Sequence, residues 1–385
     1  MVSAVLFITF FVLLVLNVPI SVCLGLSSAA AILYSGTSLT IVATNIYSGI
    51  SKFLLLAIPF FVLSGNIMAK AGISTRLIRF VDTCVGHRKG GIANVCIIVA
   101  CFFGAISGSG PATVAALGAV LIPAMIERGG FSAAFSTALM ATSSSIAIVI
   151  PPSIAFVVYA SITGVSIGDM FMAGIIPGIL MGLALVVVVM LEVRRNHVVP
   201  SNVEKASAKE RWNAFKDAFW GFLMPVIILG GIYGGIFTPT EAAAVSVVYG
   251  LFVGMIIYKE VKFKDLWEIL IDSAKTTGGI MLIVACASLF SFVCTRFGIS
   301  TAASELLARV AGNQFTFLLI CNIIFLIAGC FIDANSAMYI FIPIMLPVCK
   351  ALGYNVIAFG IMATVNLAIG QVTPPVGVNL FVAIG

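Results

Sequence analysis

The sequence predicts an all-α protein that crosses a membrane many times, and composition, hydropathy and the length of the apolar runs lead to this fold class. Of the 385 residues, 61% are hydrophobic and 9% are charged, whereas soluble domains carry about 25% charged residues. The mean hydropathy is +1.21. At roughly 20 apolar residues for each crossing, the chain has room for about ten spans and for no sizeable extramembrane domain. The runs lie at 4–33, 51–70, 91–126, 133–165, 171–193, 219–237, 240–258, 276–296, 315–349 and 355–385.

The polar residues exclude several classes of function. The 20 Lys and Arg are scattered through loops, so the net charge of +6 predicts no nucleic-acid partner. Nine cysteines show no C-x-x-C spacing, and His87 and His197 lie far apart in polar loops, which favours neither a disulfide framework nor a metal site. No Walker A sequence, G-x-S-x-G elbow, H-E-x-x-H motif or pair of carboxylates is present, so we expect no enzyme.

The first run, 4–33, is predicted to be a retained first span. No basic segment precedes it, and it stays apolar towards Leu33, unlike a secretory signal.

Two runs, 91–126 and 315–349, carry small polar residues at their centres. The first is interrupted by Ser-Gly-Ser-Gly-Pro at 107–111 and the second by Asp-Ala-Asn-Ser at 333–336. Irregular backbone at membrane depth is tolerated only where protein covers it or where it lines a watery cavity. We therefore predict that each run is a re-entrant helical hairpin, which enters and leaves on the same side.

Basic residues then divide unequally between the two sides of the membrane. If both runs are hairpins, Lys52, Arg296, Arg309 and Lys350 fall on one side and the other sixteen Lys and Arg on the opposite side. Cytoplasmic loops carry an excess of Lys and Arg. The first hairpin therefore opens to the cytoplasm and the second to the outside.

Short segments recur at an offset of about 220 residues. Gly-Ile-Ser-Thr at 72–75 returns at 298–301, and the pair Pro151-Pro152 returns as Pro374-Pro375. Collinear matches indicate a duplication, and an odd number of crossings between equivalent points gives the two copies opposite orientation. Inverted repeats with broken helices are typical of secondary transporters.

The predicted domains are these two repeats. The first, 1–218, holds scaffold spans, an arm at 72–90, the hairpin 91–126 and a broken helix at 133–165; the second, 219–385, holds an arm at 298–312, the hairpin 315–349 and a broken helix at 355–385. The second copy lacks its last span, which predicts a truncated C-terminus. The arms are amphipathic and could lie in the interface between a fixed and a moving part, or they could be ordinary polar connections.

The hairpin tips are candidate ligand sites. Hydroxyl and carbonyl oxygens at the first tip suit a hard cation such as Na⁺, and the N-terminus of the returning helix suits an anion; a packing turn without ligand is the alternative. Asp333, at the second tip, costs roughly 2.5–3.5 kcal/mol at the bilayer centre. It could complete a cation site, titrate in coupling, or cap the second helix.

The proline pairs predict that two long helices unwind at mid-depth, because each pair removes two donors and disfavours helix before it. Each break is expected to face the tip of its own repeat, which places two Na⁺ sites on either side of one anionic substrate; a kink without ligands is the alternative. The predicted Na⁺ ligands are Ser107, Gly108, Ser109, Gly110, Thr113, Ser143, Ser144, Asp333, Asn335, Ser336, Gly370 and Thr373. The predicted substrate contacts are Ser109, Pro111, Ser145, Pro152, Asn335, Asn366 and Pro375.

Glu241 is another acid in an apolar region. It follows Thr238-Pro239-Thr240, which predicts a capped helix start rather than a binding site.

Over essentially all its length the chain resembles the large membrane subunit of the tripartite ATP-independent periplasmic (TRAP) transporters. The resemblance rests on the segments Ala-Ile-Pro-Phe-Phe at 57–61, Gly-Ala-Ile-Ser-Gly-Ser at 104–109, Ile-Pro-Ala-Met at 122–125, Pro-Pro-Ser at 151–153, Phe-Thr-Pro-Thr-Glu-Ala-Ala at 237–243 and Val-Thr-Pro-Pro-Val-Gly at 372–377. It implies a bacterial inner-membrane protein with an elevator mechanism, in which a domain holding both hairpins slides against a scaffold, coupled to Na⁺. It also implies two partners, a small four-helix membrane subunit, expected as a separate chain, and a periplasmic binding protein that delivers an organic acid.

The resemblance favours a sialic-acid-type substrate, with a C4-dicarboxylate as the close alternative, since no basic residue lies at either tip. A stand-alone Na⁺ or H⁺ symporter of the same superfold, and a channel or membrane scaffold, are the competing classes.

Overall fold

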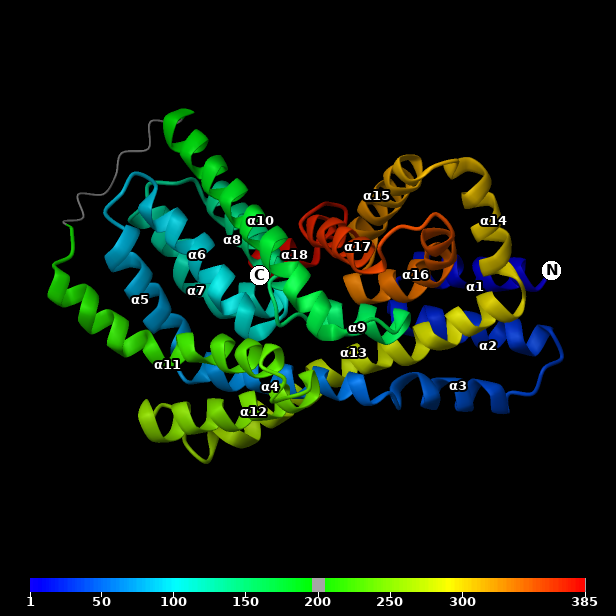
Figure 1. Cartoon of the computed structure of the whole chain (residues 1–385), viewed down its shortest axis with the longest axis horizontal. Coiled ribbons are helices and arrows are strands. Elements are labelled where there is room, and N and C mark those ends of the chain that lie inside the picture. The colour runs from blue at the N-terminus through cyan, green and yellow to red at the C-terminus, as the bar shows by residue number, and fades with distance from the viewer. Residues whose placement is uncertain (196–204, 385) are drawn as a thin grey trace.

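The computed structural model describes residues 1–195 and 205–384, and every regular element within them is helical (Figure 1). His197 lies outside the described residues. The α-helices are α1 (Val2–Val15), α2 (Ile20–Tyr34), α3 (Thr40–Ile50), α4 (Ala57–Lys70), α5 (Ile73–Val85), α6 (Gly91–Ser107), α7 (Gly110–Glu127), α8 (Ala133–Ser145), α9 (Ile154–Thr163), α10 (Ile167–Arg195), α11 (Ala208–Tyr233), α12 (Pro239–Leu251), α13 (Asp265–Arg296), α14 (Ile299–Ala311), α15 (Gln314–Phe331), α16 (Ala334–Ala351), α17 (Val356–Gly370) and α18 (Val378–Ile384). Short 3₁₀ segments η1 (Phe53–Leu56) and η2 (Ile146–Ile148) and a π-helical turn η3 (Phe252–Ile257) complete the set.

Among the described residues, eight helices are long and apolar enough to cross a membrane. They are Phe53–Lys70, Gly110–Glu127, Ile167–Arg195, Ala208–Tyr233, Pro239–Ile257, Asp265–Arg296, Gln314–Phe331 and Ala334–Ala351. At 1.5 Å per residue, even the shortest of these, with 18 residues, is about 27 Å long. The prediction of an all-α polytopic membrane protein is therefore confirmed.

The helices form two groups. In one group, α13 packs against α2, α3 and α4, while α12 packs against α4 and α11. In the other, α8 packs against α6, α7 and α18, and α17 packs against α15, α16 and α10. Figure 1 shows the long helix α13 running beneath α9 and α16, where the two groups meet.

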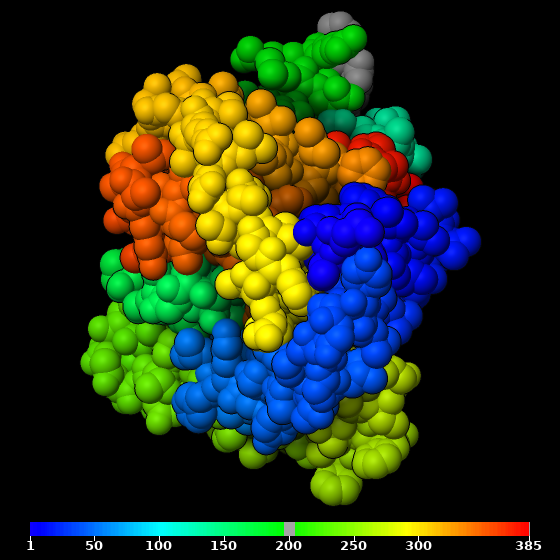
Figure 2. Space-filling model, turned by 90° about the vertical axis from the view of Figure 1, so that its right-hand side faces the viewer, coloured from blue at the N-terminus to red at the C-terminus, as the bar shows by residue number. Residues whose placement is uncertain are grey.

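Two amphipathic helices, α5 and α14, connect the groups at opposite ends of the molecule (Figure 1). Helix α5 packs between α11 and α6, and α14 packs against α13, α15 and α16. In Figure 2, α13 and α14 run down the face that is turned to the viewer, with the N-terminal helices on one side and α16 on the other. Both helices lie within the segments predicted as arms, 72–90 and 298–312.

Three predicted elements have different bounds in the structure. The run 4–33 is not one span, because the chain breaks between Leu16 and Pro19, where a proline ring excludes a continuous helix. The run predicted from 219 begins as a helix at Ala208, where Ser207 and Glu210 form a capping box. The boundary expected between 218 and 219 therefore falls inside α11. Helix α13 likewise begins at Asp265, before the apolar run that starts at 276.

Glu241 has the capping role that the sequence predicts. The Thr238 side chain accepts a hydrogen bond from the Glu241 amide, and the Glu241 carboxylate accepts one from the Thr238 amide. This reciprocal arrangement satisfies the first donors of α12.

Candidate functional site

Each of two helix pairs turns at a tip that is bonded to a Pro-Pro segment. The Gly108 carbonyl, between α6 and α7, accepts a long hydrogen bond of 3.5 Å from the Ile154 amide. The Cys330 carbonyl, near the end of α15, accepts one of 3.0 Å from the Val376 amide. Both Pro-Pro peptide bonds are cis. Each tip therefore lies against the proline break that follows it in the chain, as predicted.

The first tip is a tight turn that depends on glycine. Gly108 has φ +61°, and a Cβ atom on it would lie 2.7 Å from the Pro152 carbonyl oxygen. Behind the turn, the hydroxyls of Ser107 and Thr113 are 2.9 Å apart, and the Thr113 hydroxyl donates to the Ser109 carbonyl at 2.8 Å. Oxygen atoms are thus concentrated in a buried turn.

The first break begins after α8. The helix ends at Ser145, passes through η2 and restarts at α9, where Ser153 accepts from the Phe156 amide and donates to the Ile148 carbonyl at 2.6 Å. Ser144 and Ser145 bond to carbonyls of their own helix, whereas the buried Ser143 hydroxyl has no partner. The prediction that this helix unwinds before the proline pair is confirmed.

The second tip is organised by Asp333. One carboxylate oxygen accepts from the amides of Asn335 and Ser336 at 3.0 and 3.2 Å, and the other accepts from the Ser336 hydroxyl. Asp333 therefore caps α16, one of the three roles that the sequence left open. The side chain is half-buried, and the buried Asn335 Oδ1 has no partner.

The second break follows α17, which ends at Gly370. The Thr373 hydroxyl donates to the Ile369 carbonyl at 2.7 Å. Beyond the proline pair, the Asn379 amide nitrogen of the backbone donates to the Gln371 carbonyl at 3.0 Å. This bond folds α18 back over the end of α17.

A cavity of about 240 Å³ lies where these four segments meet. Both tips line it, together with residues of both breaks and three residues of α13. The predicted site residues that line it are Gly108, Ser109, Gly110, Pro111, Asp333 and Asn335. Segments far apart in the chain thus line one cavity.

Two long helices begin at this cavity. Gly110 is the first residue of α7 and Ala334 the first of α16, and both residues line the cavity. A helix N-terminus carries a partial positive charge and free amides, which favour anions. Among the described lining residues, Asp333 is the only ionisable one. The amides at the start of α16 already donate to Asp333, so the start of α7 is the candidate place for an anion, and Asp333 with neutral oxygens is the candidate place for a cation.

Amide oxygens converge on the start of α7. A Cβ atom on Gly110 would lie 2.8 Å from Gln371 Oε1 and 2.8 Å from the Asn379 side-chain amide. Gln371 Oε1 and Asn379 Oδ1 are buried and have no hydrogen-bond partner. Buried polar atoms are normally paired, so two unpaired oxygens beside one turn make the start of α7 a candidate place for a ligand or a water molecule.

A smaller cavity of about 70 Å³ adjoins the first tip. Ser107, Ser109 and Asn66 line it, and Asn66 donates to the Ser273 hydroxyl at 2.8 Å. Thr276 of α13 lines both cavities. The first tip is therefore in contact with both helix groups.

Several predicted site residues lie outside the larger cavity. Ser107 lines only the smaller one, and Asn366 uses its amide to donate to Asn322 Oδ1 at 2.6 Å and to the Met362 carbonyl at 2.9 Å. The others that do not line either cavity are Thr113, Ser143, Ser144, Ser145, Pro152, Ser336, Gly370, Thr373 and Pro375. The structure therefore places none of these nine residues at a cavity wall, and their roles as ligands stay predictions.

Gln371, Asn379, Asn66 and Thr276 are absent from the predicted site. Gln371 had a signal, since it is a polar residue in the Gly-Gln-Val-Thr-Pro-Pro break at 370–375. The other three are single polar residues in helices, and only the packing of distant segments brings them to the tips.

Comparison with known proteins identifies a similar family over nearly the whole chain. Residues 7–385 match the family model described as "Tripartite ATP-independent periplasmic transporter, DctM component". A C4-dicarboxylate TRAP transporter large permease protein of Rhodobacter capsulatus is 39% identical over 97% of this chain and 88% of its own. The corresponding protein of Pseudomonas aeruginosa is 42% identical over 93% and 84%. A sialic acid TRAP transporter large permease protein of Vibrio cholerae is 36% identical over 92% and 82%.

Proposed function

Since the chain belongs to the DctM family of tripartite ATP-independent periplasmic transporters, we propose that it imports an organic acid in symport with Na⁺. The supporting observation is the cavity into which two helix N-termini and the two tips converge. An anion and a cation can bind there within a few ångströms of each other, and such proximity couples their binding.

A C4-dicarboxylate is the substrate that we favour over sialic acid. The N-terminus of α7 faces the cavity and can receive one carboxylate without a basic side chain, whereas the Asn335 and Ser336 amides at the start of α16 are bonded to Asp333. The cavity of about 240 Å³ is below the roughly 300–1,000 Å³ of pockets for drug-sized ligands. A four-carbon diacid needs less room than a nine-carbon sugar acid. The relatives named for C4-dicarboxylates are also somewhat more similar than the one named for sialic acid.

The Na⁺ ions would bind at the two tips. At the first, the hydroxyls of Ser107 and Thr113 and nearby carbonyls supply oxygen ligands, which a hard cation prefers. At the second, Asp333 supplies a carboxylate, and Asn335 adds an unpaired amide oxygen. The unpaired oxygens of Gln371 and Asn379 add candidate ligands that join the two halves of the chain.

The membrane architecture belongs to the same proposal. Helices α6–α7 and α15–α16 would be re-entrant hairpins in two inverted repeats, and they would move with α8–α10, α17 and α18 as one body. The group around α13 would be the fixed scaffold, and α5 and α14 would be the arms between them. Both amphipathic helices pack against both groups, as an elevator requires.

The partners would be a small four-helix membrane subunit and a periplasmic binding protein, and the complex would lie in the bacterial inner membrane. The family description names a three-part transporter, of which this chain would be the large membrane part. The binding protein would deliver the acid to the cavity from outside.

Uptake into proteoliposomes tests this function. The chain and a cognate small subunit are reconstituted, an inward Na⁺ gradient is imposed, and labelled succinate or sialic acid is supplied with and without a cognate binding protein. Accumulation of succinate that needs both Na⁺ and the binding protein is the expected result. Accumulation of sialic acid but not of succinate would show that sialic acid is the substrate. Na⁺-driven accumulation without the binding protein would establish a stand-alone symporter.

A further inference from the structure

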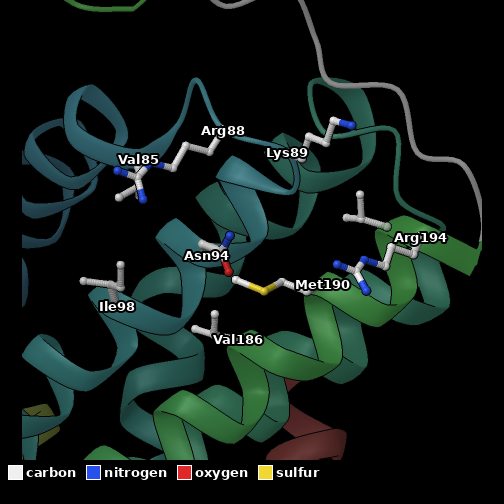
Figure 3. Close-up of a pocket in the computed structure, with 9 residues that line it drawn as sticks. Val85, Arg88, Lys89, Asn94, Ile98, Val186, Met190 and Arg194 are labelled. Carbon is white, nitrogen blue, oxygen red and sulfur yellow. The ribbon is translucent and has the colours of Figure 1, made fainter.

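A second cavity, of about 420 Å³, lies far from the tips, between the turn before α6 and the end of α10 (Figure 3). Its walls carry three basic residues, Arg88 and Lys89 from the turn and Arg194 from α10. Its floor is apolar and includes Ile98, Val186 and Met190. Figure 3 shows Arg194 extending along α10 towards Asn94 and Met190. A basic rim over an apolar floor is suited to an amphiphilic anion.

The three basic residues have no carboxylate partner among the residues that the structure describes. The ion pairs found there join other residues, such as Arg128 to Asp82 and Arg79 to Asp217. Arg88, Lys89 and Arg194 are the ionisable residues among the described ones that line the cavity. Asn94 adds a side-chain amide whose Oδ1 is buried and unpaired. Among the described lining residues, the cavity therefore carries three basic side chains and no acidic one.

The position of the basic turn is set by glycine contacts with α10. Gly90 has φ +69°, and a Cβ atom on it would lie 3.0 Å from both Val189 Cγ1 and Val193 Cγ2. A Cβ atom on Gly91 would collide with the Gly86 carbonyl oxygen, and the Gly91 amide donates to the Arg88 carbonyl at 2.8 Å. The turn is thus packed onto α10, so that Arg88, Lys89 and Arg194 line one cavity; in Figure 3 Arg88 extends towards Val85 and Lys89 points away from α6. The N-terminus of the 17-residue helix α6 follows at once and adds partial positive charge.

The location matches the cytoplasmic membrane surface. Arg88, Lys89 and Arg194 all fall on the side where sixteen of the 20 Lys and Arg gather. Below them, Met190 is 54% and Val187 also 54% exposed on a helix whose most apolar window is only 22% buried. A surface of this kind faces lipid chains, and the inner leaflet carries anionic headgroups.

We propose that this cavity binds one anionic phospholipid of the cytoplasmic leaflet. The phosphodiester would lie at the mouth of the cavity beside Arg194, and the long side chains of Arg88 and Lys89 would turn towards it; arginine can donate two hydrogen bonds to phosphate oxygens. One acyl chain would lie on Val186, Met190 and Ile98. A phospholipid and free phosphate would both be recognised through a phosphate group. The apolar floor of the cavity favours the lipid. The site is independent of the tips and of any transport activity.

Native mass spectrometry of the purified chain with added phosphatidylglycerol or phosphatidylcholine tests the site. Phosphatidylglycerol is expected to bind more tightly than phosphatidylcholine. Each basic residue near a membrane surface contributes about fivefold in affinity, so Arg88→Gln with Arg194→Gln should weaken phosphatidylglycerol binding by roughly thirtyfold. The matched control is Arg195→Gln with Lys209→Gln, which removes two cytoplasmic charges outside the cavity and should leave the affinity within about twofold of the unchanged chain.

A third variant separates the lipid from free phosphate. Met190→Trp fills the apolar floor, leaves all three charges, and is tolerable at an exposed position; it should weaken phosphatidylglycerol binding several-fold. If millimolar inorganic phosphate displaces phosphatidylglycerol and Met190→Trp has no effect on its binding, the lipid proposal is wrong and the ligand is free phosphate. Equal losses in the test and control pairs would overturn the site altogether. The proposal would also be wrong if the test pair binds the lipid as before but no longer binds the small membrane subunit. The cavity would then be a contact with that subunit.

Discussion

Gly329 of α15 and Gly370 of α17 meet backbone to backbone, at the place where the second tip joins its break. A Cβ atom on Gly329 would lie 2.9 Å from the Gly370 Cα atom. On the first side, Gly104 of α6 similarly lies against Ala147, with 2.8 Å between the Cβ position and the Ala147 Cα atom. Both contacts hold a helix of a pair against the unwound segment behind it. The tips are therefore supported by glycine contacts as much as by polar ones.

Gly370→Ala should destabilise the second tip. The new methyl group would have to occupy space that Gly329 fills, and overpacking of this kind costs about 1–3 kcal/mol. Thermal unfolding of the purified protein should show a lower Tm, and uptake should fall with it.

Gly278→Ala is the matched control, because nothing lies within 4 Å of a Cβ atom at that position in α13. Its Tm should be unchanged or slightly raised, since alanine favours helix over glycine by up to about 1 kcal/mol. Equal losses in the two variants would mean that the close contact of Gly370 is not the cause.

Gln371→Leu should weaken substrate or Na⁺ binding without unfolding the protein. Its amide oxygen is buried and unpaired beside Gly110, so the substitution breaks no internal hydrogen bond of that atom but removes a ligand. Losing one such bond costs about 0.5–1.5 kcal/mol, so the half-saturation concentration should rise about twofold to twelvefold. Uptake measured against succinate and Na⁺ concentration checks this.

Asn366→Leu is the comparison, because its amide is bonded to Asn322 and Met362 and does not line the cavity. We expect a lower Tm with half-saturation constants close to normal. A raised constant for succinate in Asn366→Leu would instead restore the substrate role that the sequence assigned to it.

Local patterns in the sequence predict where the helices turn and where they break. Glycine and small polar residues inside apolar runs predicted the tips at Gly108 and Asp333, and amphipathic spacing predicted α5 and α14. The predicted start of α11 was wrong because the first turns of this helix are polar, and hydropathy does not detect a capped polar turn. Gln371 and Thr276 reach the site only through packing between distant helices, which no local pattern contains.

Asp333→Asn should separate capping from charge. Asparagine caps a helix about as well as aspartate, so α16 should keep its N-terminus and the Tm should change little. If Asp333 binds Na⁺, removal of its charge should raise the Na⁺ concentration for half-maximal uptake by about tenfold or more, because an interaction with a charged group contributes about 1.5–3 kcal/mol. Na⁺ titration of uptake is the measurement.

Asp333→Ala removes both the cap and the charge. We expect it to lose stability as well as Na⁺ affinity, whereas Asp333→Asn loses Na⁺ affinity alone. An Asn variant with unchanged Na⁺ dependence would restrict Asp333 to its capping role.

Arg76→Ala should loosen the junction between α5 and the helix group around α13. Arg76 forms an ion pair with Glu260, donates to the carbonyls of Ala71 and Gly72 at 3.2 and 3.0 Å, and lies 3.9 Å above the Tyr258 ring. These contacts tie the start of α5 to the end of η3. Their loss together should cost about 1–3 kcal/mol, seen as a lower Tm.

Arg79→Ala, one turn further along α5, is the control for this junction. Its side chain is 70% exposed and lies 3.6 Å from Asp217, so its ion pair should contribute at most about 1 kcal/mol. If α5 is an arm that must stay anchored while the tips move, Arg76→Ala should also slow Na⁺-driven uptake, and Arg79→Ala should not. Equal uptake in both variants at a temperature where both are folded would show that this anchor does not limit transport.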